Sequence, residues 1–103
     1  MNDQKAKSDS GKMRLSLIPR EVIYGIARVR EYAVTTKYKD PDNWKKVEPQ
    51  RYWDATLRHI VAAWDNYKAR DEESGLLHIE HACCNLAFLL EFMEKEKQND
   101  NPD

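Results

Sequence analysis

Apolar residues recur every three or four positions in three separate stretches of the chain, a spacing typical of amphipathic helices. These stretches cover residues 19–38, 49–69 and 76–97. Pro19 and Pro49 stand at the start of the first two, where proline suits the first helical turn. Polar segments separate the stretches. The sequence therefore predicts three helices.

Each predicted helix carries one apolar stripe, which we expect to be its buried face. The stripes consist of Val22, Ile23, Ile26, Val29 and Ala33 in the first helix, Trp53, Leu57, Ile60, Trp64 and Tyr67 in the second, and Ile79, Ala82, Cys83, Leu86, Leu89, Leu90 and Met93 in the third. The opposite side of the third helix carries Glu80, Ala87, Glu91 and Glu94. The pattern predicts an all-α fold, a small bundle of three main helices. Because one stripe per helix makes a thin core, we expect a homodimer to complete it.

Length and charge narrow the class of protein. The chain has 103 residues, 34% of them charged, with 17 basic and 18 acidic side chains. We expect one helical domain at residues 13–97, with disordered polar tails at residues 1–12 and 98–103. The balanced charge gives no reason to expect a nucleic-acid partner. No apolar run is long enough to span a membrane, and the polar start lacks a signal-peptide core, so we expect a cytoplasmic protein.

The only two cysteines, Cys83 and Cys84, are adjacent in the sequence. Neighbouring cysteines do not readily form a disulfide with each other, and a thiolate metal site needs further thiols. We therefore expect both to be small core side chains.

The residues best suited to chemistry near neutral pH are concentrated between positions 51 and 85. At about 100° per residue, His78, His81 and Asn85 lie within an arc of about 60° on the third helix. His59 and Asn66 flank the apolar face of the second helix in the same way. An acidic loop joins the two helices and contains Asp71, Glu72 and Glu73. This pattern predicts a polar seam between two helices, with the loop at one end.

Two interpretations of the seam remain open. Histidines and carboxylates that converge in this way can bind a metal ion or transfer protons. The same side chains can instead form a buried hydrogen-bond network that only fixes how the helices pack.

A second candidate cluster surrounds the turn after the first helix. Its residues are Lys37, Tyr38, Asn43, Trp44, Lys45 and Lys46. Lysine binds phosphate, an aromatic ring can stack on a nucleotide base, and an asparagine amide can contact a base edge. The alternative is a lysine-bearing turn whose tryptophan closes the core.

Taken in order, these residues resemble a phage and prophage family named for its dATP/dGTP diphosphohydrolase N-terminal domain. The resemblance covers roughly residues 15–94, and its most specific part is RH followed by SGxxHxxHAxxN. The matching positions are Pro19, Glu21, Lys37, Tyr38, Asn43, Trp44, Tyr52, Ala55, Arg58, His59, Asp71, Ser74, Gly75, His78, His81, Ala82 and Asn85.

The resemblance implies hydrolysis of a purine dNTP to dNMP and pyrophosphate. It also implies kinship with MazG-like all-α pyrophosphohydrolases, which are metal-dependent and typically oligomeric. The chain departs from those enzymes because their paired ExxE and ExxD carboxylates have no clear counterpart here. Glu91 and Glu94 form ExxE but fall on the predicted exposed side.

The favoured hypothesis is therefore a nucleotide pyrophosphohydrolase that uses a divalent metal, Mg²⁺ or Mn²⁺, on a purine deoxynucleotide. The candidate catalytic residues are His59, Glu73 and His81. The candidate metal ligands are Asp71, His78 and His81. The candidate substrate-binding residues are Lys37, Tyr38, Asn43, Trp44, Arg58 and Asn85. The alternative is a non-catalytic phage accessory protein, a helical dimer that binds a protein partner, in which the seam is structural.

Overall fold

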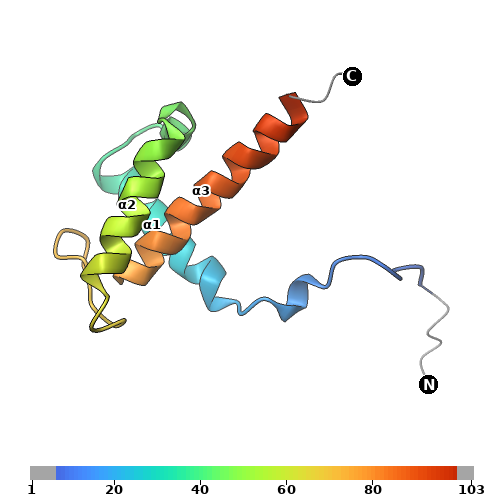
Figure 1. The fold of residues 1–103 in the computed structure, drawn as a ribbon, viewed down its shortest axis with the longest axis horizontal. Coiled ribbons are helices and arrows are strands. Elements are labelled where there is room, and N and C mark those ends of the chain that lie inside the picture. Colours follow the sequence, from blue (N-terminus) through green and yellow to red (C-terminus); the bar gives the residue numbers. More distant parts are fainter. Residues whose placement is uncertain (1–6, 100–103) are drawn as a thin grey trace.

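The computed structural model describes residues 7–99, and within them the chain forms three α-helices (Figure 1). These are α1 (Glu21–Thr36), α2 (Pro49–Ala62) and α3 (His78–Asn99), with short 3-10 helices η1 (Leu15–Leu17) and η2 (Asn43–Lys46) before and after α1. The prediction of an all-α bundle of three main helices is confirmed. Parts of both predicted tails, residues 1–6 and 100–103, lie outside the described residues. No helix among the described residues is both long and apolar enough to cross a membrane.

Helix α1 ends two residues before the predicted boundary. The hydroxyls of Thr35 and Thr36 donate to carbonyls one turn back, those of Glu31 and Tyr32. Such bonds offer the backbone an alternative to continuing the helix. The chain before α1 leads away from the bundle, and η1 has no buried residue (Figure 1).

Helix α2 begins at Pro49 as predicted, but the predicted end near residue 69 is wrong. The helix stops at Ala62, and Ala63 already has a non-helical backbone with φ −100° and ψ 11°. Beyond it, the Asn66 side-chain oxygen accepts the backbone N–H of Lys68 at 3.0 Å. Asparagine favours such local turns over helix, and apolar spacing alone does not register this competition.

Helix α3 begins at His78, two residues after the predicted start, and Glu80 caps it. The Glu80 carboxylate accepts the backbone N–H of Leu77 at 3.0 Å, which is half of a capping box. The Ser74 hydroxyl, in the preceding loop, accepts the N–H of Leu76 at 3.1 Å and so orders that loop. The prediction that Glu80 faces solvent is wrong, because it is 8% exposed and paired with Arg28.

Helix α3 packs against both other helices and supplies most of the core. Val29, Cys84 and Phe88 form its centre, and the rings of Trp44 and Tyr52 pack around them. Cys84 is 1% exposed, as expected for a core thiol, and burial raises its pKa to about 11. The thiol is therefore protonated at neutral pH and packs as a small apolar group.

The predicted apolar face of α2 is not buried within one chain. Trp53, Leu57 and Ile60 are each more than 40% exposed, and Trp64 and Tyr67, beyond the helix, are more exposed still. The helix packs instead through the fully buried Thr56, whose hydroxyl donates to the Tyr52 carbonyl. Small side chains permit a closer helix contact than tryptophan does. This explains why α2 turns its Thr56 side, and not its tryptophan-bearing face, toward the core.

The predicted stripes of the other two helices are only partly buried. Val29 and Ala82 are buried as expected. The exposed members are Val22, Ile23, Ile79, Leu86, Leu90 and Met93. A single chain therefore leaves apolar residues of all three helices in contact with solvent.

Candidate functional site

A pocket of about 500 Å³ lies between the three helices and η2. Its apolar wall is formed by core residues, among them Val29, Cys84 and Phe88. The volume falls within the range of small-molecule binding sites in proteins. Because α1, α2 and α3 all contribute residues, the pocket depends on the packing of the whole bundle.

The polar lining of the pocket is rich in positive charge. Four basic side chains contribute to it: Arg30, Lys37, Arg51 and Arg58. Only two carboxylates, Asp40 and Asp54, oppose them, and both have other partners, Lys46 at 3.6 Å and Gln50 at 3.1 Å. An excess of lysine and arginine in a concave site favours an anionic ligand such as a phosphate.

Seven of the candidate site residues predicted from the sequence line this pocket. They are Lys37, Tyr38, Asn43, Trp44, Arg58, His81 and Asn85. All six predicted substrate-binding residues are among them, so the structure brings together residues from α2, α3 and the turn after α1. Lys45 and Lys46 are exposed outside the pocket lining and pair with Asp42 and Asp40.

Trp44 combines a core position with its place in the pocket wall. Its ring stacks on Phe88 with centroids 4.4 Å apart and meets Phe92 edge-on at 5.6 Å. The Tyr52 hydroxyl donates to the Trp44 carbonyl at 3.1 Å, which fixes η2 against α2. One face of the indole is therefore occupied, and the half-exposed Tyr38 is the more accessible aromatic ring at the pocket.

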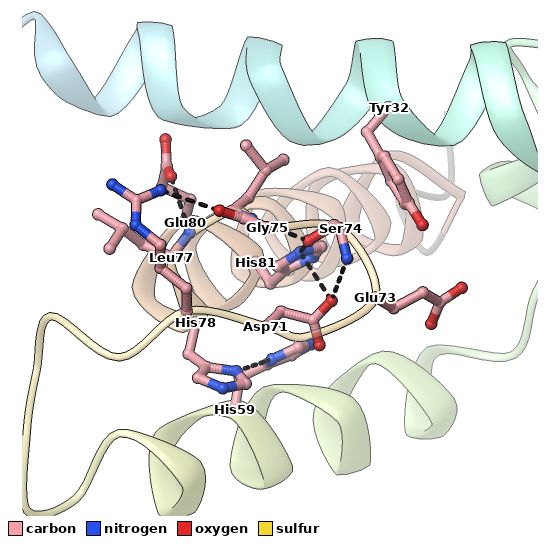
Figure 2. A network of polar contacts seen from close by, with 12 residues as sticks. Tyr32, His59, Asp71, Glu73, Ser74, Gly75, Leu77, His78, Glu80 and His81 are labelled. Atoms are coloured by element: carbon pink, nitrogen blue, oxygen red, sulfur yellow. Dashed lines mark hydrogen bonds and ion pairs between the residues drawn. The ribbon is translucent and has the colours of Figure 1, made fainter.

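The three histidines converge beside the pocket (Figure 2). His59, in the last turn of α2, lies with its Nδ1 atom 2.9 Å from Nδ1 of His78. The ring of His59 also stacks on that of His81, with centroids 4.6 Å apart and planes 7° apart. The predicted seam between the second and third helices thus exists, although Asn66 lies outside it, exposed on the turn after α2.

The acidic loop holds one carboxylate next to these rings. Asp71 Oδ2 accepts the backbone N–H of Ser74 at 2.9 Å and lies 3.9 Å from His81 Nε2. The Ser74 hydroxyl contacts the same His81 nitrogen at 2.7 Å. Gly75, with φ +75°, takes the left-handed conformation that lets its N–H donate to the Asp71 carbonyl. Asp71, Ser74 and His81 therefore form one connected network.

Burial sets the charge of this cluster. Removal from water lowers the pKa of both His59 and His81 and outweighs the opposing effect of Asp71; His78 lowers both further, and His81 also lowers that of His59. Burial alone would raise the pKa of Asp71, but hydrogen bonds from Ser74 and the adjacent His81 bring it below its ordinary value. At neutral pH the cluster thus offers neutral imidazoles at His59 and His81 and an ionised carboxylate at Asp71, the forms that bind metal ions or accept protons.

Glu73, a predicted catalytic residue, does not join the histidines. Its carboxylate pairs with Lys37 Nζ at 2.6 Å, and both side chains are about half exposed. The hydrogen bond from Lys37 to Glu73 raises the lysine pKa, so Lys37 carries its charge. This ion pair connects the acidic loop to the pocket.

Four residues of the site were not among the candidate site residues predicted from the sequence. Arg30, Arg51 and Tyr52 line the pocket, and Ser74 contacts His81. Arg51 and Tyr52 stand in the stretch that was singled out, but only the packing of α2 against α3 shows which of its residues face the pocket. The SG pair of the quoted motif was the available signal for Ser74.

The fold and site define an all-α protein with a basic, aromatic-lined pocket next to a histidine–carboxylate cluster. The chain belongs to the family described as dATP/dGTP diphosphohydrolase, N-terminal, whose sequence profile matches residues 2–102. The predicted family is thereby confirmed.

One similar protein, from Salmonella phage PMBT28, is named dATP/dGTP diphosphohydrolase. It is 30% identical over 95 residues, which cover 92% of this chain and 32% of the relative. The chain therefore spans about a third of the length of that protein. No solved structure shows a significant match.

Proposed function

We propose that this chain binds a purine deoxynucleoside triphosphate and hydrolyses it to the monophosphate and pyrophosphate with the help of a divalent metal ion. The observation that carries the proposal is the pocket of about 500 Å³, whose four basic side chains stand beside the histidine–carboxylate cluster. The name of the phage relative, a dATP/dGTP diphosphohydrolase, supports the same substrate class.

Binding of the triphosphate is assigned to the basic lining. Lys37, Arg51 and Arg58 neutralise the phosphates, and the guanidinium groups offer paired donors to phosphate oxygens. Tyr38 stacks on the base. The amides of Asn43 and Asn85 each provide a donor and an acceptor for a base edge.

The donors beside the pocket fit a divalent ion. His59, Asp71 and His78 each offer one ligand atom, and these atoms lie within 4.8 Å of one another. An ion held by these residues would neutralise phosphate charge and lower the pKa of a bound water. In this arrangement Asp71 and His78 keep the ligand role expected from the sequence, and His59 joins them.

His81 is suited to accept the proton of the attacking water, because it is neutral at pH 7 and lies both in the pocket wall and next to Asp71. The water oxygen forms a bond to the α-phosphorus while the bond from that phosphorus to the oxygen bridging to the β-phosphorus breaks. Pyrophosphate leaves with the bonding electrons. Ser74, in contact with His81 Nε2, orients the imidazole.

The experiment is pyrophosphate release from a panel of dNTPs and NTPs with Mg²⁺ or Mn²⁺, with EDTA as the control. We expect metal-dependent release confined to purine deoxynucleotides. Arg58→Gln should raise KM, whereas Arg20→Gln, an exposed arginine outside the pocket lining, should not. No release, together with no nucleotide-induced rise in Tm, would contradict the proposal.

A second candidate function is a helical homodimer that binds a protein partner without catalysis. The exposed apolar side chains favour it, since three of them are each more than 60% exposed: Val61 in α2, Trp64 just after α2, and Leu90 on α3. His81→Ala separates the two functions. Loss of turnover with retained helix content supports catalysis, whereas unfolding without any nucleotide binding supports a structural seam.

A further inference from the structure

The contact between His59 and His78 places two metal-ligating atoms face to face. Their Nδ1 atoms are 2.9 Å apart, and Figure 2 shows the two rings turned toward each other. Two imidazole nitrogens can bond directly only when one carries a proton and the other a lone pair. A cation that takes the place of this proton would meet two lone pairs.

The separation suits neighbouring ligands of one ion. Metal–nitrogen bonds of about 2.1 Å at right angles place adjacent ligand atoms about 3 Å apart. The observed 2.9 Å between His59 and His78 is close to this value. The ion would lie beside the line that joins the two nitrogens, so both rings must turn to direct their lone pairs at it.

The third donor is held in position by its own loop. The Asp71 backbone N–H donates to the Leu76 carbonyl at 2.7 Å, and its side chain accepts from Ser74. The N–H of His78 donates to the Ala69 carbonyl at 3.1 Å. Ligands fixed in this way by surrounding hydrogen bonds lose little entropy when a metal binds.

His81 is less suited to be a ligand of the same ion. Its ring is nearly parallel to that of His59, 4.6 Å away, so the nitrogens of the two rings do not converge. Its Nε2 atom is already engaged by the Ser74 hydroxyl. The ligand set is therefore His59, Asp71 and His78, with further coordination positions left for water or a phosphate oxygen.

The chemistry of this donor set selects a class of ion. We propose that His59, Asp71 and His78 form a transition-metal site that binds Mn²⁺, Co²⁺ or Zn²⁺ in preference to Mg²⁺. Imidazole nitrogen suits these ions, whereas Mg²⁺ prefers oxygen ligands and keeps several waters. The proposal deepens the proposed function by naming the class of metal, and the binding itself requires no nucleotide.

The test is calorimetric titration of metal-free protein with Co²⁺ and with Mg²⁺, without nucleotide. We expect one Co²⁺ per chain, bound at least about 100-fold more tightly than Mg²⁺. His78→Ala and Asp71→Asn should each weaken Co²⁺ binding by more than about 100-fold, and His81→Asn by no more than about 10-fold. Glu72→Gln, an exposed carboxylate in the same loop, is the matched control and should change nothing.

Two results would overturn the proposal: equal affinity for Mg²⁺ and Co²⁺, or a His81→Asn variant that loses as much affinity as His78→Ala. X-ray absorption of the Co²⁺-loaded unmodified protein tests the site even where a variant fails to fold. Two imidazoles in the first shell are expected, and a shell of oxygen alone contradicts the site.

Separate assays distinguish this proposal from the proposed function. Tight Co²⁺ binding without pyrophosphate release would support the metal site and contradict the proposed hydrolase function. Release with Mg²⁺ that survives His78→Ala, in a chain that binds no Co²⁺, would support the hydrolase and contradict the metal site.

Discussion

Arg28 and Glu80 form an ion pair across the bundle, with Arg28 Nε 2.6 Å from Glu80 Oε2, and this pair joins α1 to the first turn of α3. The Glu80 side chain is 9% exposed, and its second oxygen caps the helix at Leu77. One carboxylate therefore fixes both the start of α3 and its contact with α1. Because His78 and His81 flank Glu80 in the sequence, the same contacts position two imidazoles of the candidate site.

Removal of the Glu80 carboxylate should destabilise the fold. Glu80→Ala removes a cap and a partly buried ion pair, and we expect a loss of about 2 kcal/mol in the free energy of unfolding. Arg28 is half exposed, so its charge is not stranded in the core. Urea denaturation measures the effect. Glu91→Ala, at an exposed position of the same helix, is the control and should cost less than about 0.5 kcal/mol.

The same carboxylate predicts a loss of stability in acid. Burial alone would raise the pKa of Glu80, but the bonds from Arg28 and Leu77 bring it below its ordinary 4.5. Since the folded-state pKa is the lower one, the contribution is complete above about pH 4.5 and is lost as pH falls through the folded-state pKa. Unfolding free energies of the natural chain and Glu80→Gln should therefore converge between pH 5 and the folded-state pKa. A constant difference over this range would contradict the assignment.

Gly25 should reveal how closely α1 approaches Glu80. A Cβ atom at this position would lie 3.3 Å from both Cγ and Oε2 of Glu80. Alanine normally stabilises a helix interior by up to about 1 kcal/mol relative to glycine. We expect Gly25→Ala to lose this gain in the natural chain and to recover it in the Glu80→Ala background. A double-mutant cycle measures the coupling between the two positions. An equal gain in both backgrounds would show that the Glu80 side chain moves away from the added Cβ atom with no loss of stability.

The existence of the three helices was predictable because apolar spacing is a local property of the sequence. Which side of a helix is buried was not, because it depends on the neighbouring helices. Glu80 was assigned to solvent from its place on the helical wheel, yet it is buried because Arg28 on α1 lies opposite. Trp64 was assigned to the core, yet it lies beyond the end of α2 and is 75% exposed.

The candidate site was likewise predictable only in part. His78, His81 and Asp71 were expected together because helical spacing and a short loop place them within reach of one another. The contact of His59 with His78 depends on the register of α2 against α3, so helical spacing alone predicted a seam but not which side chains meet in it. Arg30 faces the pocket only because α1 packs on α3, so no local pattern marked it.

The apolar side chains left exposed by the single chain predict self-association. Leu57 and Ile60 lie on one face of α2 and are 42% and 41% exposed. We expect a homodimer by light scattering coupled to size-exclusion chromatography, as the thin core suggested. Ile60→Glu should convert the dimer to a folded monomer, because burial of a charge in an apolar interface is costly.

The control for self-association is Ala62→Glu, which adds the same charge to an exposed position on another side of α2. It should leave the dimer intact. A natural chain that is monomeric at high concentration would exclude the homodimer and leave the exposed face for a different protein.

The ion pair between Lys37 and Glu73 predicts competition between the acidic loop and the ligand of the pocket. Lys37 lines the pocket, and its ammonium lies 2.6 Å from the Glu73 carboxylate, so a phosphate must compete for the same charge. Partly exposed pairs contribute about 0.2–1 kcal/mol. Glu73→Gln should therefore tighten nucleotide binding by a factor of about 1.4 to 5, whereas Glu72→Gln should leave the Kd unchanged. Calorimetry with a purine dNTP measures both. If Glu73→Gln instead weakens binding and abolishes turnover, Glu73 acts on the substrate directly, which is the catalytic role expected from the sequence.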